Sequence, residues 1–501
     1  MTAIRKSVAW FTGAKDKEQA RVLLTFLALL CLLISYYLIK PLRNSKFLEE
    51  FHPSRLPLVY AGVATLSFAV TKVFSHMAKR VEKYRLVTGA YATIICCKLL
   101  LGAWMQFGGK PAVVCFYLFA SVYFLLAVAT LWACINDMFT VDQGERCFGF
   151  VALGSTIGGI VGSHISEMIA KGPYRGYTLY FSIVFMAMAL GLVLIAAKIN
   201  KDRPAHRGIL EEKKEARGDF WSELRALAQR PYLRRIAMTV LFLGVATTAI
   251  EFVSQSTIDR ELAKQQYQIR FANIEGADFQ AIYTLKTKSQ SEREEFLQHL
   301  GQVSGQGFDK VQQEYQAYRS DLEAETRTFF SQTYKFQGIA GVLSLLIVAR
   351  FLFPRVGMRF CFVLLPFLSI VGLCLFGLTV DLFLVQVVIV LVGAINYSLN
   401  NAAKEILYTA TDEETLFRFK PMIEGPCMRA GDVLSSILKL SVGFVAASFA
   451  LSEESSTNLF LAVTMVVLMV WIRAAWLAGK EYDRMRKASP QVPPVPEPPT
   501  L

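Results

Sequence analysis

The residues best suited to binding chemistry are a lysine and a glutamate that follow a long apolar segment. Lys404 and Glu405 stand in the stretch NYSLNNAAKEILYTATDEETLFR (396–418), and we expect them to form an ion pair. An ionisable side chain at membrane depth costs about 2.5–3.5 kcal/mol on insertion scales, so a charge there usually has a partner or a ligand. Asn396 and Asn400 precede Lys404 at four-residue spacing and share a helix face with it. This polar stripe predicts an ion-binding site, with a hydrogen-bonded seam between helices as the alternative.

Three cations end the first apolar segment, and a carboxylate lies in the seventh. Lys40, Arg43 and Lys46 are spaced at three-residue steps, which on a helix spread over an arc of about 120°. All three could face one cavity; the simpler alternative is that they reach toward the membrane surface from a helix end. Glu251 follows LFLGVATTAI, with Gln255 one turn later. We expect its carboxylate to pair with a cation inside the bundle rather than to mark the membrane boundary.

Aromatic and polar side chains also gather near the inner end of the fourth apolar segment, at Trp132, Asn136 and Asp137. An indole could stack on a planar base, or it could anchor the helix at the membrane surface, and the sequence does not decide between them. Lysine and arginine side chains that converge with aromatics would suit a polyanion such as a phosphorylated solute, because lysine acts as a point charge toward phosphate.

A bundle of membrane helices must position these residues. The chain has 501 residues, 54% of them hydrophobic, and its apolar runs are roughly 18–25 residues long, the length at which a helix spans a bilayer. We therefore predict an all-α membrane protein with about twelve spans in two six-helix halves. The expected spans are 21–40, 57–77, 86–107, 112–135, 148–170, 177–198, 236–254, 333–353, 359–380, 382–402, 428–450 and 458–478.

Charged and polar stretches divide these spans into domains. The expected parts are an N-terminal half (1–199), a cytoplasmic linker (200–235), a C-terminal half (236–254 and 333–480), a polar helical insert outside the membrane (255–332) and a disordered proline-rich tail (481–501). The insert could gate the solute, bind a partner protein or act as steric cover.

The lysines and arginines of the short loops fall on one face of this topology, which places both termini on the cytoplasmic side of a multi-pass protein. The expected location is the bacterial inner membrane. The formal net charge of +13 then reflects these loops beside anionic lipid headgroups. No nucleic-acid-binding pattern accompanies the charge, so the expected partners are a solute and the lipid bilayer.

Cysteine and histidine give no sign of a metal or catalytic site. The nine cysteines fall in or at the ends of expected spans and lack paired zinc-ligand spacing. The five histidines are scattered, and no GxSxG, HExxH or phosphate loop accompanies them. We expect no cofactor, no metal and no enzymatic activity.

An internal repeat supports the two halves. Six residues of the first half recur at a constant offset of 269 in the second: Phe139, Thr140, Glu145, Phe148, Phe150 and Gly162 correspond to Tyr408, Thr409, Glu414, Phe417, Phe419 and Gly431. Both segments join the fourth to the fifth span of their half. Duplicated six-helix halves are the architecture of major-facilitator-type transporters. The acidic residues of the two segments are expected to act in gating or as hinges: Asp142, Glu145, Asp412 and Glu414.

Several stretches resemble one known family. YSLNNAAKEILYTATDEE (397–414) is similar to a segment of the ATP/ADP translocase (nucleotide transporter) family of intracellular bacteria and plastids. LRNSK (42–46), LWACINDMFTVDQGERCFGFVALGS (131–155) and AIEFVSQS (249–256) resemble it more loosely. The resemblance covers most of the membrane domain but not 255–332. It implies a major-facilitator-like secondary transporter that exchanges nucleotides or other phosphorylated anions by alternating access.

The resemblance also assigns residues. The family's first-span lysine corresponds to Lys46, its seventh-span glutamate to Glu251 and its tenth-span lysine to Lys404. Its fourth-span glutamate falls on Thr130, which leaves the site more positive and leaves the solute open between ATP/ADP, another nucleotide, a smaller phosphorylated metabolite and an unrelated anion.

Together, the residues and the resemblance give one expected set of substrate-binding residues: Lys46, Glu251, Lys404, Arg43, Trp132, Asn400 and Asn136. The competing prediction, from another functional class, is a transporter-derived membrane protein that has lost or altered transport and whose insert mainly binds a partner.

Overall fold

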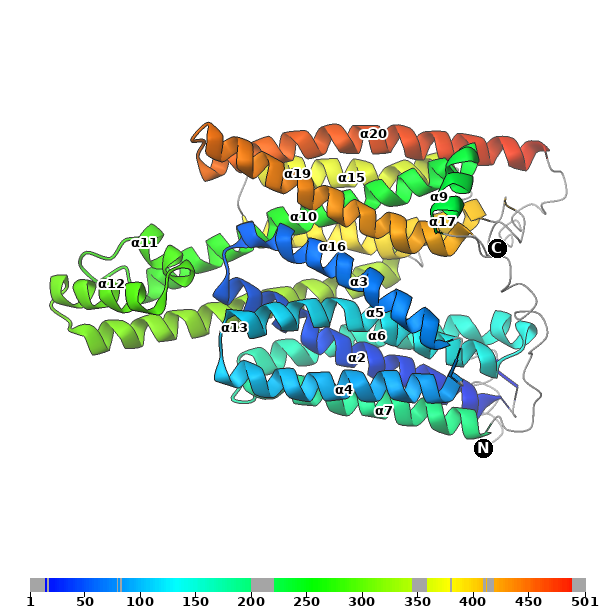
Figure 1. The fold of residues 1–501 in the computed structure, drawn as a ribbon, viewed down its shortest axis with the longest axis horizontal. Helices are drawn as coiled ribbons and strands as arrows, with labels where there is room; N and C mark the ends of the chain where they lie inside the picture. Colours follow the sequence, from blue (N-terminus) through cyan, green and yellow to red (C-terminus); the bar gives the residue numbers. More distant parts are fainter. Residues whose placement is uncertain are drawn as a thin grey trace, which may run out of the picture. The chain divides into compact units, whose positions relative to one another are not determined.

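A computed structural model describes residues 14–15, 18–78, 80–81, 83–199, 220–344, 358–378, 381–408, 411 and 419–488. Every regular element within them is a helix (Figure 1). The expectations for most of the linker (200–219), for residues 412–418 and for the proline-rich tail from 489 onward lie outside the described residues.

Eleven of the described helices are long and apolar enough to cross a membrane, which confirms the all-α membrane fold. The first, Gln19–Glu50, and the seventh, Pro231–Arg270, extend well past their expected ends. The remaining expected span, 333–353, begins inside the helix Phe308–Ser344, and its second half lies outside the described residues.

The chain divides into two compact units. The first comprises Met1–Arg55, Thr65–His206 and Ile258–Gly338, and the second comprises Leu56–Ala64, Arg207–Thr257 and Ile339–Leu501. Most of the 255–332 insert therefore belongs to the same unit as the first six helices.

The described helices fall into three groups. The first unit holds α2 (Gln19–Glu50), α4 (Lys83–Phe107), α5 (Lys110–Met138), α6 (Val141–Ala170), α7 (Thr178–Ile199), α11 (Phe279–Thr284) and α12 (Gln290–Val303). The second unit holds α9 (Phe220–Gln229), α15 (Met358–Leu378), α16 (Leu382–Ile395), α17 (Asn401–Tyr408), α19 (Met428–Ser448) and α20 (Glu453–Ala488). Helices with residues in both units are α3 (Leu56–Ala78), α10 (Pro231–Arg270) and α13 (Phe308–Ser344).

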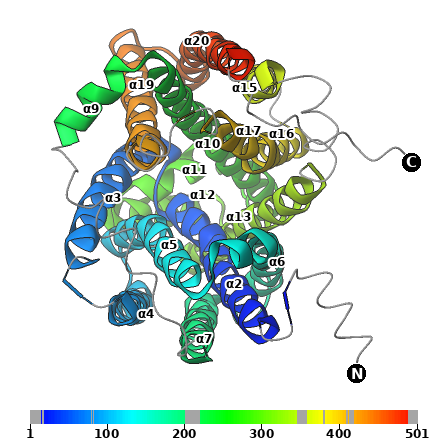
Figure 2. The ribbon, with the colours of Figure 1, turned by 90° about the vertical axis from the view of Figure 1, so that its right-hand side faces the viewer.

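Helix α2 is the central helix of the first unit, where it packs against α5, α6 and α7 (Figure 2). Gly154, Gly158 and Gly162 follow one another at four-residue spacing on the α6 face that meets α2. A Cβ atom on Gly158 would lie only 2.4 Å from the carbonyl oxygen of Leu30. Small residues at this spacing let two membrane helices approach at backbone distance.

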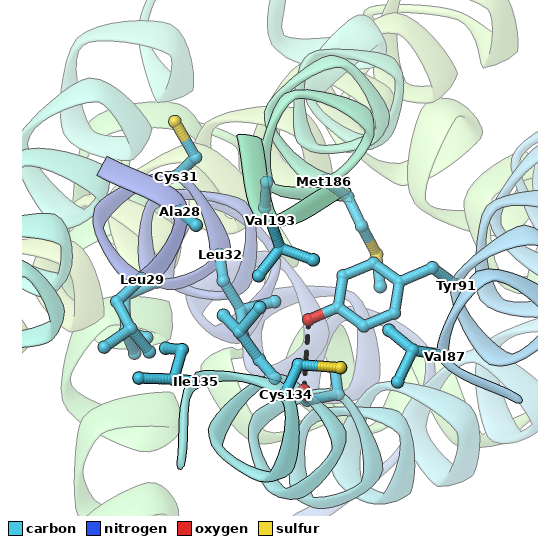
Figure 3. Close-up of a cluster of buried hydrophobic side chains, with 14 of the residues drawn as sticks. Ala28, Leu29, Cys31, Leu32, Val87, Tyr91, Cys134, Ile135, Met186 and Val193 are labelled. Atoms are coloured by element: carbon cyan, nitrogen blue, oxygen red, sulfur yellow. Dashed lines mark hydrogen bonds between the residues drawn. The ribbon is translucent and has the colours of Figure 1, made fainter. Parts of the chain in front are cut away.

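A cluster of buried apolar side chains surrounds α2 in this unit. Figure 3 shows part of it, where Leu32 of α2, Val87 of α4 and Met186 of α7 surround the ring of Tyr91. The Tyr91 hydroxyl is satisfied because it donates to the backbone oxygen of Ala127 at 3.0 Å. Pairing of this kind removes the free-energy cost of burying a polar group.

The second unit repeats the glycine contact. A Cβ atom on Gly431 of α19 would lie 2.2 Å from the carbonyl oxygen of Leu241 on α10, and one on Gly244 would lie 2.5 Å from that of Met428. Gly431 is the repeat counterpart of Gly162. In each unit, glycines at corresponding positions thus hold the fifth helix of a half against its first.

The 255–332 insert is helical, as expected. Helix α10 continues into it as far as Arg270, and α11, a 3₁₀ turn (Leu285–Thr287), α12 and the first part of α13 follow. In Figure 1, α11 and α12 lie beyond the ends of α2, α5 and α6. Ser289 starts α12 with a capping box, in which it accepts from the Glu292 amide and the Glu292 side chain accepts in return.

Helix α13 is bound to the first six helices by several hydrogen bonds. Arg327 donates to the Thr178 hydroxyl of α7, and Lys335 pairs with Glu167 of α6. Its tyrosine Tyr334 accepts from the α2 side chain of Asn44. Arg327 belongs to the insert, which from Ile258 onward is part of the first unit.

Candidate functional site

The lysine and the glutamate of the 396–418 stretch have separate partners. The Nζ atom of Lys404 lies 3.9 Å from a carboxylate oxygen of Glu424, whereas Glu405 pairs with Lys420 at 2.7 Å. The expected ion pair between Lys404 and Glu405 is therefore wrong. Consecutive residues of a helix point about 100° apart, so each side chain finds its partner on a different side.

The asparagine stripe before Lys404 lies in an unusual turn. Residues Asn396–Asn400 form a π-helix between α16 and α17, and the Asn400 side chain donates to the Asn396 oxygen at 3.1 Å. A second π-helix, Ile423–Cys427, contains Pro426 and precedes α19. Such π turns occur frequently at functional sites because they redirect side chains within a helix.

Glu251 lies on α10 beside Gln255 and near three residues that the sequence reasoning did not single out. Gln255 donates to its carboxylate at 3.1 Å. One turn earlier, the Thr248 hydroxyl donates at 2.8 Å to Asp432 of α19, which also pairs with Arg429 at 2.9 Å. An arginine and an aspartate three residues apart inside an apolar helix are a detectable signal, and the sequence reasoning overlooked it.

Two of the first-span cations lie on tyrosine rings in the first unit. The Lys40 Nζ atom is 3.8 Å from the Tyr334 ring centre, and the Arg43 guanidinium is 4.6 Å from the centre of Tyr117. Arg43 is buried and donates to the Ser121 hydroxyl at 2.9 Å. A cation over an aromatic face is stabilised by the ring quadrupole, more strongly where water is excluded. Positive charges and aromatic rings are therefore adjacent in this part of the first unit.

A buried cation of the first unit, Lys98 of α4, was missed. Its side chain is 0% exposed, and its amine donates to the hydroxyls of Ser35 at 2.9 Å and Ser182 at 2.8 Å. The amine also lies 4.5 Å from the Tyr123 ring centre. A single lysine inside the apolar run IICCKLLL was the signal that could have found it, since ionisable residues at membrane depth usually have a function.

Lys46 occupies different surroundings. It pairs with Glu49 at 2.8 Å and lines a cavity of about 450 Å³ together with Arg175, Arg319 and Glu323. Lys40 and Arg43 do not line this cavity, so the three cations of the first span do not share it.

The side chains near the inner end of the fourth span have different surroundings. Trp132 contacts Phe148 edge-to-face at 5.8 Å, and Asn136 is exposed. Thr130, at the position of the family's glutamate, donates to the Leu126 carbonyl of its own helix at 2.8 Å. This position therefore adds no charge to its surroundings.

The beginning of α6 carries a polar cluster that the sequence reasoning also missed. Gln143 donates to Glu18 at 2.8 Å and accepts from Arg21 at 3.1 Å, and Arg146 pairs with Glu18 at 3.3 Å. Burial opposes ionisation of Glu18, but an amide hydrogen bond from Lys15 and the Arg146 charge outweigh it and hold the pKa of this carboxyl below its usual value. The cluster joins the start of the first span to the first turns of α6.

The expected gating residues stay predictions. Asp142 and Glu145 belong to the first turns of α6, but their side chains lie outside the described residues. Asp412 and Glu414 lie outside them entirely.

Comparison with known proteins adds two findings. Residues 344–482 match the family model described as "TLC ATP/ADP transporter". No curated protein matches the chain by sequence.

Solved transporters share the fold over nearly the whole chain. A bacterial homologue of the human lysosomal transporter Spinster, inward-facing and unoccupied, is 10% identical, covers 94% of this chain and 99% of its own, and has a TM-score of 0.57. The nucleoside transporter NupG is 13% identical over 94% of this chain and 100% of its own, at 0.52. An autoinhibited POT-family peptide transporter is 12% identical over 95% and 99%, at 0.56.

At these identities the likeness concerns the fold alone, and all three are carriers of the major-facilitator type. The family match falls on the part of the chain that holds Lys404 and the 397–414 block. The resemblance to the ATP/ADP translocases is thus confirmed over residues 344–482, which match the model of the ATP/ADP transporter family, and the chain has an all-α membrane fold similar to that of these transporters.

Proposed function

We propose that this membrane transporter exchanges nucleotides of the ATP/ADP type, or other phosphorylated anions, by alternating access. The observation that carries the proposal is the pair of first-span cations held on tyrosine rings, Lys40 over Tyr334 and Arg43 over Tyr117. Positive charge next to aromatic surface suits a solute with phosphates and a planar base. The family match at 344–482 supports the same class of solute.

In this proposal the second unit supplies its own ligands. Lys404 is the anion ligand of α17, and Glu251 tunes the net charge of the site from α10. Asn400 would hydrogen-bond the solute from the π-helix, where its side chain is buried. Trp132 and Asn136 are proposed contacts on α5. The loops after the fourth and tenth spans, with their acidic residues, would act as hinges.

Exchange follows from the charge of such a site. An empty site rich in lysine and arginine is costly to reorient across the membrane, and a bound anion lowers that cost because it neutralises part of the charge. Carrying a counter-substrate back therefore speeds the return step. Because Thr130 stands where the family has a glutamate, the proposed site has one negative charge fewer. We therefore propose that it favours solutes with a higher negative charge. The proposed location is a bacterial inner membrane with both termini in the cytoplasm.

Uptake by purified protein in liposomes tests the proposal. We expect uptake of labelled nucleotides that rises when an unlabelled nucleotide is enclosed. The change Lys404→Ala should lower kcat/KM roughly ten- to hundredfold, the equivalent of one charge-assisted contact worth about 1.5–3 kcal/mol.

The matched control is Lys264→Ala, which removes an exposed lysine from the insert part of α10 and should leave uptake unchanged. Absence of uptake for every nucleotide, or uptake that Lys404→Ala does not alter, would contradict the proposed function.

A further inference from the structure

One carboxylate at the end of α2 is shared between a membrane helix and the insert. Lys46 pairs with Glu49 at 2.8 Å. Arg319 of α13 reaches the same carboxylate at 3.5 Å and pairs with its neighbour Glu50 at 2.5 Å. Two cations from different elements thus bind Glu49, Lys46 at one carboxylate oxygen and Arg319 of the insert at the other.

The shared carboxylate lines a cavity large enough for a small molecule. Its volume is about 450 Å³, within the range of roughly 300–1,000 Å³ usual for ligand sites. Its charged lining comprises three cations, Lys46, Arg175 and Arg319, and two carboxylates, Glu49 and Glu323. The lining is therefore positive by one formal charge, and further anion binding becomes possible if Lys46 is released from Glu49.

The other charged groups of the lining have contacts of their own, and the Glu323 charge also attracts Lys46. Arg175, on the turn between α6 and α7, donates to the backbone and hydroxyl oxygens of Ser320, which are neutral acceptors. Glu323 accepts from the Ser45 hydroxyl at 2.8 Å. A guanidinium has five N–H donors in a fixed fork, so Arg319 can hold Glu49 and Glu50 together.

We propose that the cavity beneath α13 is an outer binding site for an anion with several phosphate groups, and that Arg319 is a positioning residue that takes Glu49 from Lys46 when the anion arrives. Lys46 and Arg175 then contact the phosphates directly. In this scheme the insert makes Lys46 available because its Arg319 binds the Glu49 carboxylate. The choice of phosphates rests on the proposed function; the exchange of Glu49 rests on the geometry alone.

A purely structural role for Arg319 predicts something different. If the contacts of Arg319 only hold the insert in place, then Arg319→Gln loosens α13. Removing the Glu49 charge as well then does not restore anion binding. If Arg319 instead draws Glu49 away from Lys46, the defect of Arg319→Gln disappears once Glu49 has lost its charge. A pair of variants, Arg319→Gln and Arg319→Gln with Glu49→Gln, separates the two.

A cysteine reporter measures occupancy of the cavity without any need for transport. Gln316 is exposed and lines the cavity, and the 255–332 insert contains no cysteine. Modification of Gln316→Cys by N-ethylmaleimide, an uncharged reagent, is therefore read from the mass of an insert peptide. We expect sodium tripolyphosphate to slow this modification severalfold, and adenosine to have no effect.

The variants are tested in the Gln316→Cys background. Arg319→Gln should raise the tripolyphosphate concentration for half-protection about three- to tenfold, and added Glu49→Gln should return it to the starting value. Arg175→Gln should raise it as well, without rescue by Glu49→Gln. Lys310→Gln, which removes an exposed charge from α13 outside the cavity, should change nothing.

Two results would overturn the outer site. The first is no protection of Gln316→Cys by tripolyphosphate at any concentration. The second is protection by vesicles containing phosphatidylglycerol but not by tripolyphosphate, which would assign the cavity to a lipid headgroup. Lack of rescue by Glu49→Gln would overturn the role of Arg319. In the uptake assay, Arg319→Gln should raise KM and leave kcat unchanged. Protection without uptake of any nucleotide would contradict the proposed function and support the outer site.

Discussion

Replacing Asp259 with alanine is expected to destabilise the protein by about 3–5 kcal/mol, the usual cost of removing one partner from a buried ion pair. The carboxylate and the amine of Lys286 are 2.6 Å apart, and both side chains are almost fully buried. Lys286 also donates to the Leu48 carbonyl at the end of α2, and the Tyr283 hydroxyl donates to Asp259. Without Asp259, the lysine would remain buried beside one backbone oxygen. Thermal unfolding of the purified protein measures the loss.

A double variant identifies the cause. Asp259→Leu with Lys286→Met replaces both charges with apolar groups of similar size, and such exchanges are often neutral or stabilising. It should recover most of the stability that Asp259→Ala loses. Glu295→Ala, at an exposed position of α12, should stay within about 0.5 kcal/mol of the parent. A double variant as unstable as the single one would show that the pair is held for its hydrogen bonds and not for mutual compensation of charge.

Gly158→Leu is expected to prevent normal assembly of the first unit. Its Cβ atom alone would meet the Leu30 oxygen at 2.4 Å and the Leu33 Cβ at 3.0 Å, so helices α2 and α6 would have to move apart. Overpacking a core costs about 1–3 kcal/mol and occasionally more, and here the obstacle is backbone that cannot turn away. We expect a sharp fall in monodisperse protein after purification and a lower Tm.

Gly149→Leu is the matched control, because it lies on the same helix with nothing within 4 Å of its Cβ position. Gly431→Leu tests the repeat, since it should damage the second unit as Gly158→Leu damages the first. Equal yields and Tm values for the Gly158 and Gly149 variants would contradict the role given to the close contact.

The membrane helices were predictable because the apolar runs have the length of a bilayer. The ends of the helices were not, since α2 and α10 continue into polar sequence that only tertiary contacts stabilise. Lys98 was predictable in principle from its place in an apolar run, but its serine partners come from two other helices. The residue next to Lys404 in sequence gave the wrong ion pair, because helix geometry directs neighbours to different sides.

The insert shows a further limit. Its helices were predictable from periodicity, but not the surface against which they pack. The polar faces of α13 are satisfied by α2, α6 and α7, through residues such as Arg319 and Arg327. Each contact is between groups more than a hundred residues apart, and no local pattern encodes it. The same limit applies in the second unit to the hydrogen bond between Thr248 and Asp432, which are 184 residues apart.

The composition of the first unit has a consequence for biosynthesis. It comprises three separated stretches of chain, and the last of them, Ile258–Gly338, is made only after α2, α4, α5, α6 and α7. While the ribosome is still translating α10, Glu167 and Thr178 lack Lys335 and Arg327, their partners on α13. The first half therefore cannot finish folding in the order of synthesis, and a nascent chain stalled before residue 320 should expose to proteases the surface that α13 later covers.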